Sequence, residues 1–151
     1  MRRWDSRRSA YDSARYIEPA EDRRDGLLDY LGDLARAHPE AGYYLENGGW
    51  MGPSRAPGPG EGHLRTRDNM CYYVAQTSMG PGHEYAEGYV VSDGGAVPHA
   101  WLVDDDGAVV ELAPSLQDMD VDHFGVTFPP WLVTRTMSER ETADPIVEAV
   151  A

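Results

Sequence analysis

Three short apolar runs, separated by turn-forming residues, constrain the fold of this chain more than any other feature. They cover residues 85–91, 99–103 and 108–112, are rich in β-branched and aromatic side chains, and are bounded by Gly, Pro or Asp. Such runs are typical of antiparallel strands joined by tight connections. A fourth run, at residues 123–128, is closed by two prolines. The sequence therefore predicts a small antiparallel sheet in the second half of the chain.

A helix is expected ahead of these strands. Residues 23–37 carry leucines spaced three and four positions apart, which indicates an amphipathic helix, and Pro39 ends the pattern. The following residues 48–62 are so rich in Gly and Pro that we expect a loop. A long loop of this kind is either a binding loop or a plain connector.

Two further helices complete the predicted α+β fold. Residues 68–79 begin with Asp68 and Asn69, which are good N-cap residues, and end before a Gly-Pro-Gly turn. Residues 131–140, after the last predicted strand, also suit a short helix. The fold class that we expect is α+β, with the helix over residues 68–79 packed on the antiparallel sheet.

Length and composition fit one folded domain. The chain has 151 residues, of which 41% are hydrophobic, and this is enough to build a single core. Residues 23–141 are assigned to an α+β domain, residues 1–22 to a basic N-terminal arm and residues 142–151 to an acidic tail. Two interpretations of the arm stay open, namely docking on the acidic body of the protein and a solvated, frayed terminus.

The charge balance argues against several classes of partner. The formal net charge is −13, so both a phosphate backbone and an anionic membrane surface would be repelled, and we expect neither nucleic acid nor membrane as a partner. The chain has one cysteine, no signal-peptide pattern and no long apolar run, which predicts a cytoplasmic protein. No glycine-rich phosphate-binding motif is present, so no nucleotide cofactor is expected.

The single cysteine, Cys71, is the first candidate for chemistry. It lies near the start of the helix predicted over residues 68–79, where free backbone N–H groups and the helix dipole favour a thiolate. A thiolate is the nucleophilic form of cysteine. The alternative is that Cys71 is a small buried hydrophobic residue, which is common for a free cysteine.

His99 and Glu111 are the candidate partners of that thiol. They lie on two consecutive predicted strands, and if the turn between them is centred on Asp105 they face each other across the hairpin. A carboxylate that orients one ring nitrogen leaves the other free to take a thiol proton, which is the arrangement of a catalytic triad. An ordinary cross-strand surface pair is the alternative for His99 and Glu111.

The order of these residues resembles the transglutaminase-like core of the papain-like cysteine superfamily. The resemblance covers residues 69–114 and rests on a helix-borne Cys71, on His99 followed by Ala and Trp, and on Glu111 in the next strand. It implies the triad roles for these three residues and a papain-like fold. Members of that family carry Asp followed by Pro at the third position, so Asp104 is the alternative third member. Residues 122–128 are also similar to small phage and actinobacterial proteins that share this core.

The function that this resemblance implies is acyl transfer or amide hydrolysis through a thioester on Cys71. The substrate would be a small molecule or peptide that contains an amide or an ester. Water as acceptor would make the protein an amidase or peptidase and an amine would make it an acyltransferase, and both outcomes stay open. The alternative is a catalytically silent papain-like domain that serves in binding or in phage assembly.

Three aromatic residues are candidates for the wall of a substrate cleft, namely Trp101, Tyr89 and Trp50, with packing in the core as the alternative for the first two. No metal site is expected. Aspartates alternate at residues 118–122 as in a calcium loop, but His123 and Pro129 stand where that loop needs Gly and Glu. One cysteine also excludes the usual structural zinc clusters.

Overall fold

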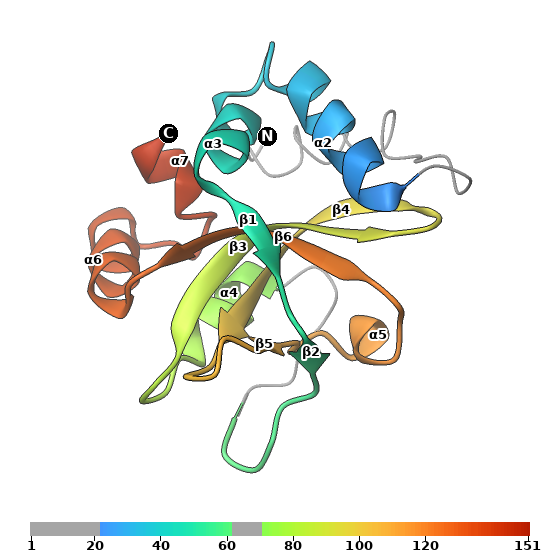
Figure 1. Ribbon diagram of the computed structural model, residues 1–151. Helices are drawn as coiled ribbons and strands as arrows, with labels where there is room; N and C mark the ends of the chain where they lie inside the picture. Colours follow the sequence, from blue (N-terminus) through green and yellow to red (C-terminus); the bar gives the residue numbers. More distant parts are fainter. Residues whose placement is uncertain (1–21, 62–70) are drawn as a thin grey trace.

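A mixed six-stranded β-sheet lies at the centre of the molecule (Figure 1). The computed structural model describes residues 22–61 and 71–151. Neighbouring strands are antiparallel except for β2 and β5, which run parallel. In the order β1-β6-β3-β4-β5-β2, the strands are β1 (Gly49–Met51), β6 (Asp122–Phe128), β3 (Glu84–Ser92), β4 (Gly95–Val103), β5 (Val109–Val110) and β2 (Ser54–Arg55).

The sheet curls until its two ends meet. Strands β1 and β2 lie at opposite ends of the strand order, yet only Gly52 and Pro53 separate them in the chain. Because the chain extends by at most roughly 3.6 Å per residue, this link cannot span a flat sheet of six strands. Figure 1 shows the chain passing directly from β1 to β2.

The four strands predicted from sequence are confirmed as β3 to β6, although β5 is shorter than expected. The prediction that residues 48–62 form a loop was wrong in part, because β1 and β2 lie within it. Both are short strands at the ends of the sheet, where Gly and Pro are tolerated. Their partners lie far away in sequence, so no local pattern reveals them.

Helices flank the sheet in the part of the chain that the structure describes. The helices predicted from sequence correspond to α2, α4 and α6, whereas the sequence did not predict α3, which Pro39 begins rather than prevents. The proposed N-cap residues Asp68 and Asn69, and residues 1–21 of the basic arm, lie outside the described residues. The helices are α2 (Arg23–Leu34), α3 (Pro39–Asn47), α4 (Cys71–Thr77), α5 (Pro114–Gln117), α6 (Pro130–Arg140) and α7 (Val147–Val150).

Buried apolar residues form two clusters. The larger one joins helical residues such as Leu27, Val74 and Val133 to one face of the sheet. The smaller one consists of Ala86, Val90, Trp101 and Val109, all from strands. Partly buried residues from β1 and α5 also pack against the smaller cluster, so it is enclosed by the curl of the sheet.

A buried carboxylate attaches the end of the chain to the sheet. Glu87 of β3 accepts hydrogen bonds from the backbone N–H groups of Ile146 (2.8 Å) and Val147 (2.5 Å). The side chains of Ile146 and Val147 are buried. Residues 142–151, which the sequence suggested to be an acidic tail, are therefore packed on the domain through these contacts. The hydroxyl groups of Tyr44 and Tyr85 also donate to Glu87.

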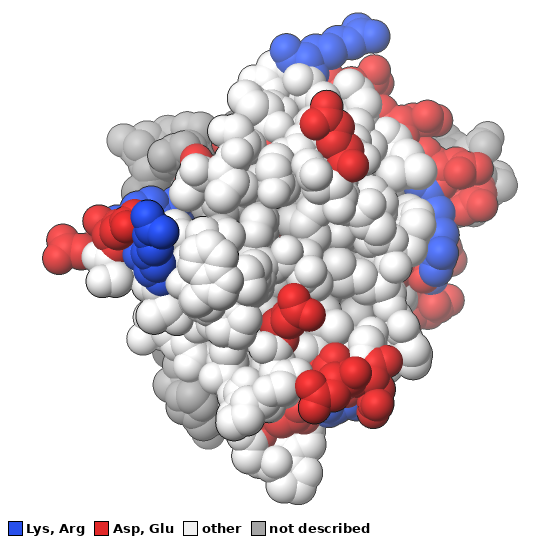
Figure 2. Space-filling model, turned by 60° about the vertical axis from the view of Figure 1, so that its left-hand side comes forward, with Lys and Arg blue, Asp and Glu red and all other residues white. Residues whose placement is uncertain are grey.

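The outer surface carries mostly negative charge. Figure 2 shows one face on which a broad uncharged area is interrupted by scattered Asp and Glu side chains, with fewer Arg. Among the helices that the structure describes, none is long and apolar enough to cross a membrane.

Candidate functional site

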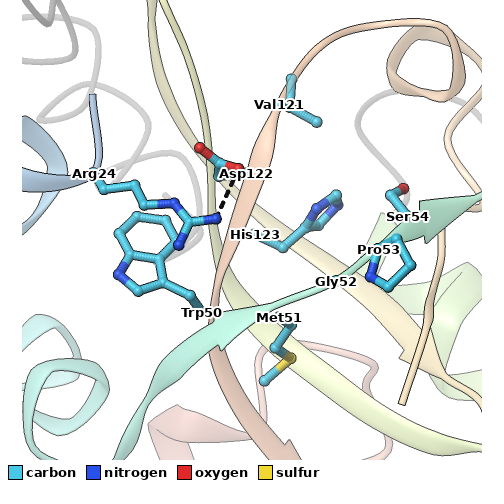
Figure 3. Close-up of a pocket in the computed structure, with 9 residues that line it drawn as sticks. All are labelled: Arg24, Trp50, Met51, Gly52, Pro53, Ser54, Val121, Asp122 and His123. Carbon is cyan, nitrogen blue, oxygen red and sulfur yellow. Dashed lines mark hydrogen bonds and ion pairs between the residues drawn. The ribbon is translucent and has the colours of Figure 1, made fainter. Parts of the chain in front are cut away.

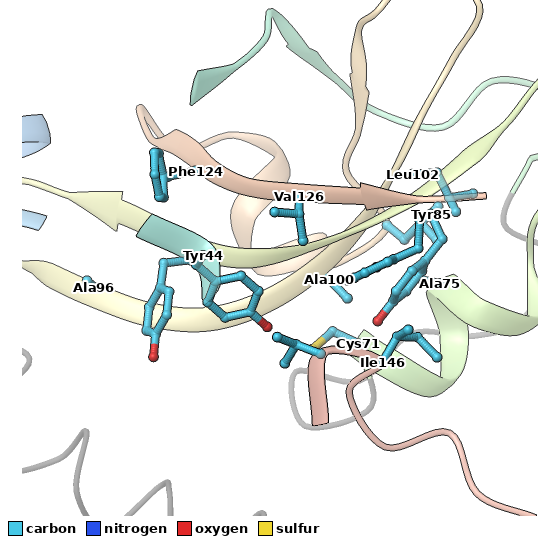
Figure 4. Close-up of a cluster of buried hydrophobic side chains, with 14 of the residues drawn as sticks. Tyr44, Cys71, Ala75, Tyr85, Ala96, Ala100, Leu102, Phe124, Val126 and Ile146 are labelled. Carbon is cyan, nitrogen blue, oxygen red and sulfur yellow. The ribbon is translucent and has the colours of Figure 1, made fainter. Parts of the chain in front are cut away.

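Cys71 is the first described residue of α4, the helix that packs on β4. Its thiol lies in the larger apolar cluster, near Ala100 and Tyr85 (Figure 4), and 8% of the residue is exposed. The thiol lies close enough to the imidazole of His99 to raise the pKa of the ring. His99 lies on the same face of β4 as Trp101 of the smaller cluster, so this contact links the two clusters.

His99 is held from its other side by Glu111. The Nε2 atom of His99 lies 2.7 Å from Oε2 of Glu111. The two residues therefore meet as the sequence predicted, but the predicted register was wrong. Strand β4 pairs with β5 through Leu102 and Val110, so the position opposite Glu111 is Trp101. The shift of two residues keeps Glu111 on the face of His99, and the pair meets diagonally.

Glu111 is an ionised carboxylate in a fully buried position. It accepts three hydrogen bonds, from His99, from the backbone N–H of Ala113 (3.0 Å) and from His123 (2.8 Å). Burial alone would raise the pKa of Glu111, but the positive charge of His99 and the hydrogen bonds outweigh it and lower the pKa to about 2. The carboxylate is therefore negative at neutral pH and can stabilise an imidazolium.

His99 is correspondingly stabilised in its protonated form. Burial opposes the positive charge, yet the charges of Glu111 and Cys71 together raise the pKa of His99 to about 10. A protonated imidazole beside a sulfur stabilises a thiolate, and it can later return the proton. Since Nε2 is bound to Glu111, Nδ1 is the ring nitrogen left for the thiol. The structure thus brings together a thiol, an imidazole and a carboxylate.

Asp104, the alternative third member, is engaged elsewhere. Its Oδ2 accepts a hydrogen bond from Nε of Arg55 at 3.1 Å, and its Oδ1 accepts from the backbone of the turn that follows β4. The structure thus places Asp104 in an ion pair and a turn, away from the ring of His99. Arg55 also binds Glu61, so the group fastens residues 55–61 to that turn.

The three aromatic cleft candidates have different positions. Trp101 and Tyr89 are buried in the two clusters, which is the core packing given as their alternative. Trp50 of β1 is half-buried and lines a cavity of about 350 Å³, where the guanidinium of Arg24 lies 4.7 Å from the centre of its ring (Figure 3). His123 lines the same cavity.

His123 is a member of the site that the sequence analysis missed. It belongs to β6, two strands away from β4 in the sheet, and reaches Glu111 because the sheet is curled. In the sequence, the only indication was that His123 begins a predicted strand, and this does not predict which residue its side chain contacts. Within residues 22–61 and 71–151, no group of three or more His, Cys, Asp or Glu side chains is arranged to hold a metal ion.

Comparison of the chain with protein-family models, with curated proteins and with solved structures gives no match.

Proposed function

We propose that this protein is a cysteine-dependent acyl-transfer enzyme with a papain-like, transglutaminase-like core. One observation carries the proposal, the placement of the Cys71 thiol where it interacts with the imidazole of His99, which is itself bound to the carboxylate of Glu111 at 2.7 Å. Each group has the chemical character that its role needs: a thiol beside an imidazole, an imidazole with a raised pKa, and an ionised acid.

The proposed reaction has two halves. In the first, the Cys71 thiolate attacks the carbonyl carbon of an amide or ester, a C–S bond forms, and the C–N or C–O bond breaks. His99 gives its proton to the departing amine or alcohol. In the second half, neutral His99 takes a proton from water or an amine, which attacks the thioester, and the C–S bond breaks to restore the thiolate. Glu111 stabilises His99 whenever the ring is protonated.

The acyl acceptor decides between hydrolysis and transfer. Water would release an acid, as in an amidase or peptidase, and an amine would yield a new amide. The proposed substrates are small molecules or peptides that contain an amide or ester group. Since the chain has no lysine, its own side chains cannot serve as lysine acceptors.

The pH dependence of alkylation by iodoacetamide tests the activated thiol, because Cys71 is the one cysteine of the chain. We expect rapid modification at pH 6.5, well below about pH 8.5 where a free thiol ionises. In His99→Ala the rate at this pH should fall by about tenfold or more. His38→Ala is the matched control, since the half-buried His38 forms no side-chain cap at α3. A wild-type rate equal to that of a free thiol contradicts the proposal.

Acyl transfer itself is tested with an activated ester such as p-nitrophenyl acetate. A rapid burst of p-nitrophenol and a mass increase of one acetyl group on the intact protein are the expected signs of the thioester. The burst should be absent in Cys71→Ser. A wild-type protein that releases p-nitrophenol no faster than Cys71→Ser would not be the proposed enzyme.

A second candidate is a catalytically silent papain-like domain that acts in binding or in phage assembly. The observation that favours it is burial, because only 8% of Cys71 and 3% of His99 are exposed. In such a protein the interaction of Cys71, His99 and Glu111 would be structural. Slow alkylation of Cys71, unaffected by His99→Ala, is the result expected of this candidate.

A further inference from the structure

His123 contacts the carboxylate that holds His99. Its Nε2 atom lies 2.8 Å from Oε1 of Glu111, while Nε2 of His99 lies 2.7 Å from Oε2 of the same group. We propose that His123 is a positioning residue for the acyl-transfer site, which holds Glu111 ionised and aimed at His99 by donating a hydrogen bond to its second oxygen. This inference rests on the proposed function and adds a fourth residue to it.

Hydrogen-bond chemistry fixes the tautomer of both rings. An ionised carboxylate only accepts hydrogen bonds, so each imidazole must carry its proton on Nε2. For neutral His99 this leaves the lone pair on Nδ1, the ring nitrogen that Glu111 does not bind. A carboxylate bound on one oxygen alone could rotate away from His99. Two histidine donors and the N–H of Ala113 hold Glu111 in one orientation.

Burial and packing keep His123 in place. The residue is 1% exposed, and its ring packs on the edge of Trp101 at 4.8 Å between centroids and 72° between planes. His99 also stacks on Trp101, with 6.0 Å between the ring centroids. A single indole thus supports both imidazoles. Such support around a reactive group is what keeps its geometry fixed.

The surroundings of His123 contain few other charges. The ring lines the cavity described above, in which Arg24 and Asp122 are the charged residues, and these two pair with each other at 3.2 Å (Figure 3). Glu111 is the one acid hydrogen-bonded to His123 in the described part of the chain. The hydrogen bond to Glu111 is therefore the contact through which His123 would influence the thiol.

Two substitutions of similar size separate this hydrogen bond from packing. In His123→Gln the side-chain amide can donate to Glu111 from nearly the place of Nε2, whereas in His123→Met no donor remains. Both variants lose the imidazole ring, so structural effects of that loss are shared. We expect the alkylation rate of Cys71 at pH 6.5 to fall about tenfold in His123→Met and to stay within about threefold of wild type in His123→Gln.

The results separate the two proposals. A fast wild-type rate with no loss in His123→Met overturns the role of His123 and leaves the proposed function standing. A wild-type rate equal to that of a free thiol overturns the proposed function itself, and the role of His123 with it. Should the variants fail to fold, the ¹⁵N NMR spectrum of the wild-type protein decides. An Nε2–H tautomer at His123 is expected, and an Nδ1–H tautomer overturns the inference.

Discussion

Glu111 gives the candidate site its electrostatic character, because it is a fully buried carboxylate with two imidazole partners. Moving a lone carboxylate out of water is costly, and here three hydrogen bonds and the positive charge of His99 offset that cost. Together with Cys71, the same carboxylate raises the pKa of His99 to about 10 against the effect of burial. The protonation state of the histidine therefore depends strongly on the charge of Glu111.

Glu111→Gln should lower the pKa of His99 by at least about one unit, because a neutral amide of the same size cannot stabilise the imidazolium. An NMR titration of the His99 ring protons measures this shift. Asp104→Asn is the matched control, since it neutralises an acid that binds Arg55 instead of His99, and it should leave the titration of His99 unchanged. An unchanged pKa in Glu111→Gln would show that Glu111 does not set the charge of His99.

Part of this site could be predicted from the sequence, because strand patterns indicate which residues share a face but not which distant strands meet. Cys71, His99 and Glu111 were found by their order and by strand periodicity, which keeps residues two positions apart on one face. The register was wrong because the turn after β4 extends from Asp104 to Ala108, with Gly107 at a φ of 81°. His123 was missed because its contact with Glu111 depends on the curl of the whole sheet.

At the scale of elements, the close approach of β3 and β6 shapes the sheet. Gly88 and Gly125 pair directly across these two strands. A Cβ atom on Gly88 would collide with the backbone of Phe124, and one on Gly125 with the backbone of Glu87. Glycine at both positions allows the strands to approach where β6 brings His123 toward Glu111. Backbone proximity of this kind has no apolar pattern, so the sequence did not indicate it.

Gly88→Ala should therefore destabilise the protein by about 3 kcal/mol, since an added methyl group must push β3 away from β6. The free energy of unfolding in urea measures the change. Gly94→Ala is the control, because Gly94 lies in the turn between β3 and β4 and an added Cβ there meets no atom within 4 Å. That variant should stay within about 0.5 kcal/mol of wild type. Equal stability of the two variants would contradict the close approach.

The apolar strands and the two long helices were predictable, because their residues alternate or repeat with the period of a regular element. By contrast, β1 and β2 exist only as partners of β6 and β5. Their sequence is that of a Gly- and Pro-rich loop, and tertiary pairing overrides it. The structure thus places Trp50 in a strand beside His123, where the sequence placed it in a loop.

At the scale of the whole molecule, a few buried ionisable groups control how stability responds to pH. His99 and Glu87 both have a raised pKa, His99 because Glu111 and Cys71 outweigh its burial, and Glu87 because burial disfavours its charge. Glu111 and Glu61 have pKa values lowered to about 2. For Glu111 the charge of His99 outweighs the effect of burial, and for Glu61 the main cause is the hydrogen bond from Arg55. The raised pKa values reduce stability as pH rises, and the lowered ones reduce it as pH falls.

We expect the protein to be most stable in mildly acidic solution, near pH 5. A group with a raised pKa binds its proton more tightly in the folded state, so its stabilisation is lost as pH rises. For His99 that loss runs from about 6.5 to about 10, and for Glu87 it begins near 4.5. The lowered pKa values of Glu111 and Glu61 cause a loss as pH falls from 4.5 toward about 2.

Urea unfolding between pH 3 and pH 10 measures this profile. The midpoint concentration should fall steadily from pH 6 to pH 10, and Glu111→Gln should flatten that decline, because His99 then titrates nearer its ordinary pKa. Asp104→Asn should keep the wild-type slope in this range, since Asp104 titrates in acid, where its hydrogen bonds with the Ala108 backbone and Arg55 lower its pKa. A midpoint that rises between pH 6.5 and pH 10 would mean that His99 is not protonated in the folded protein.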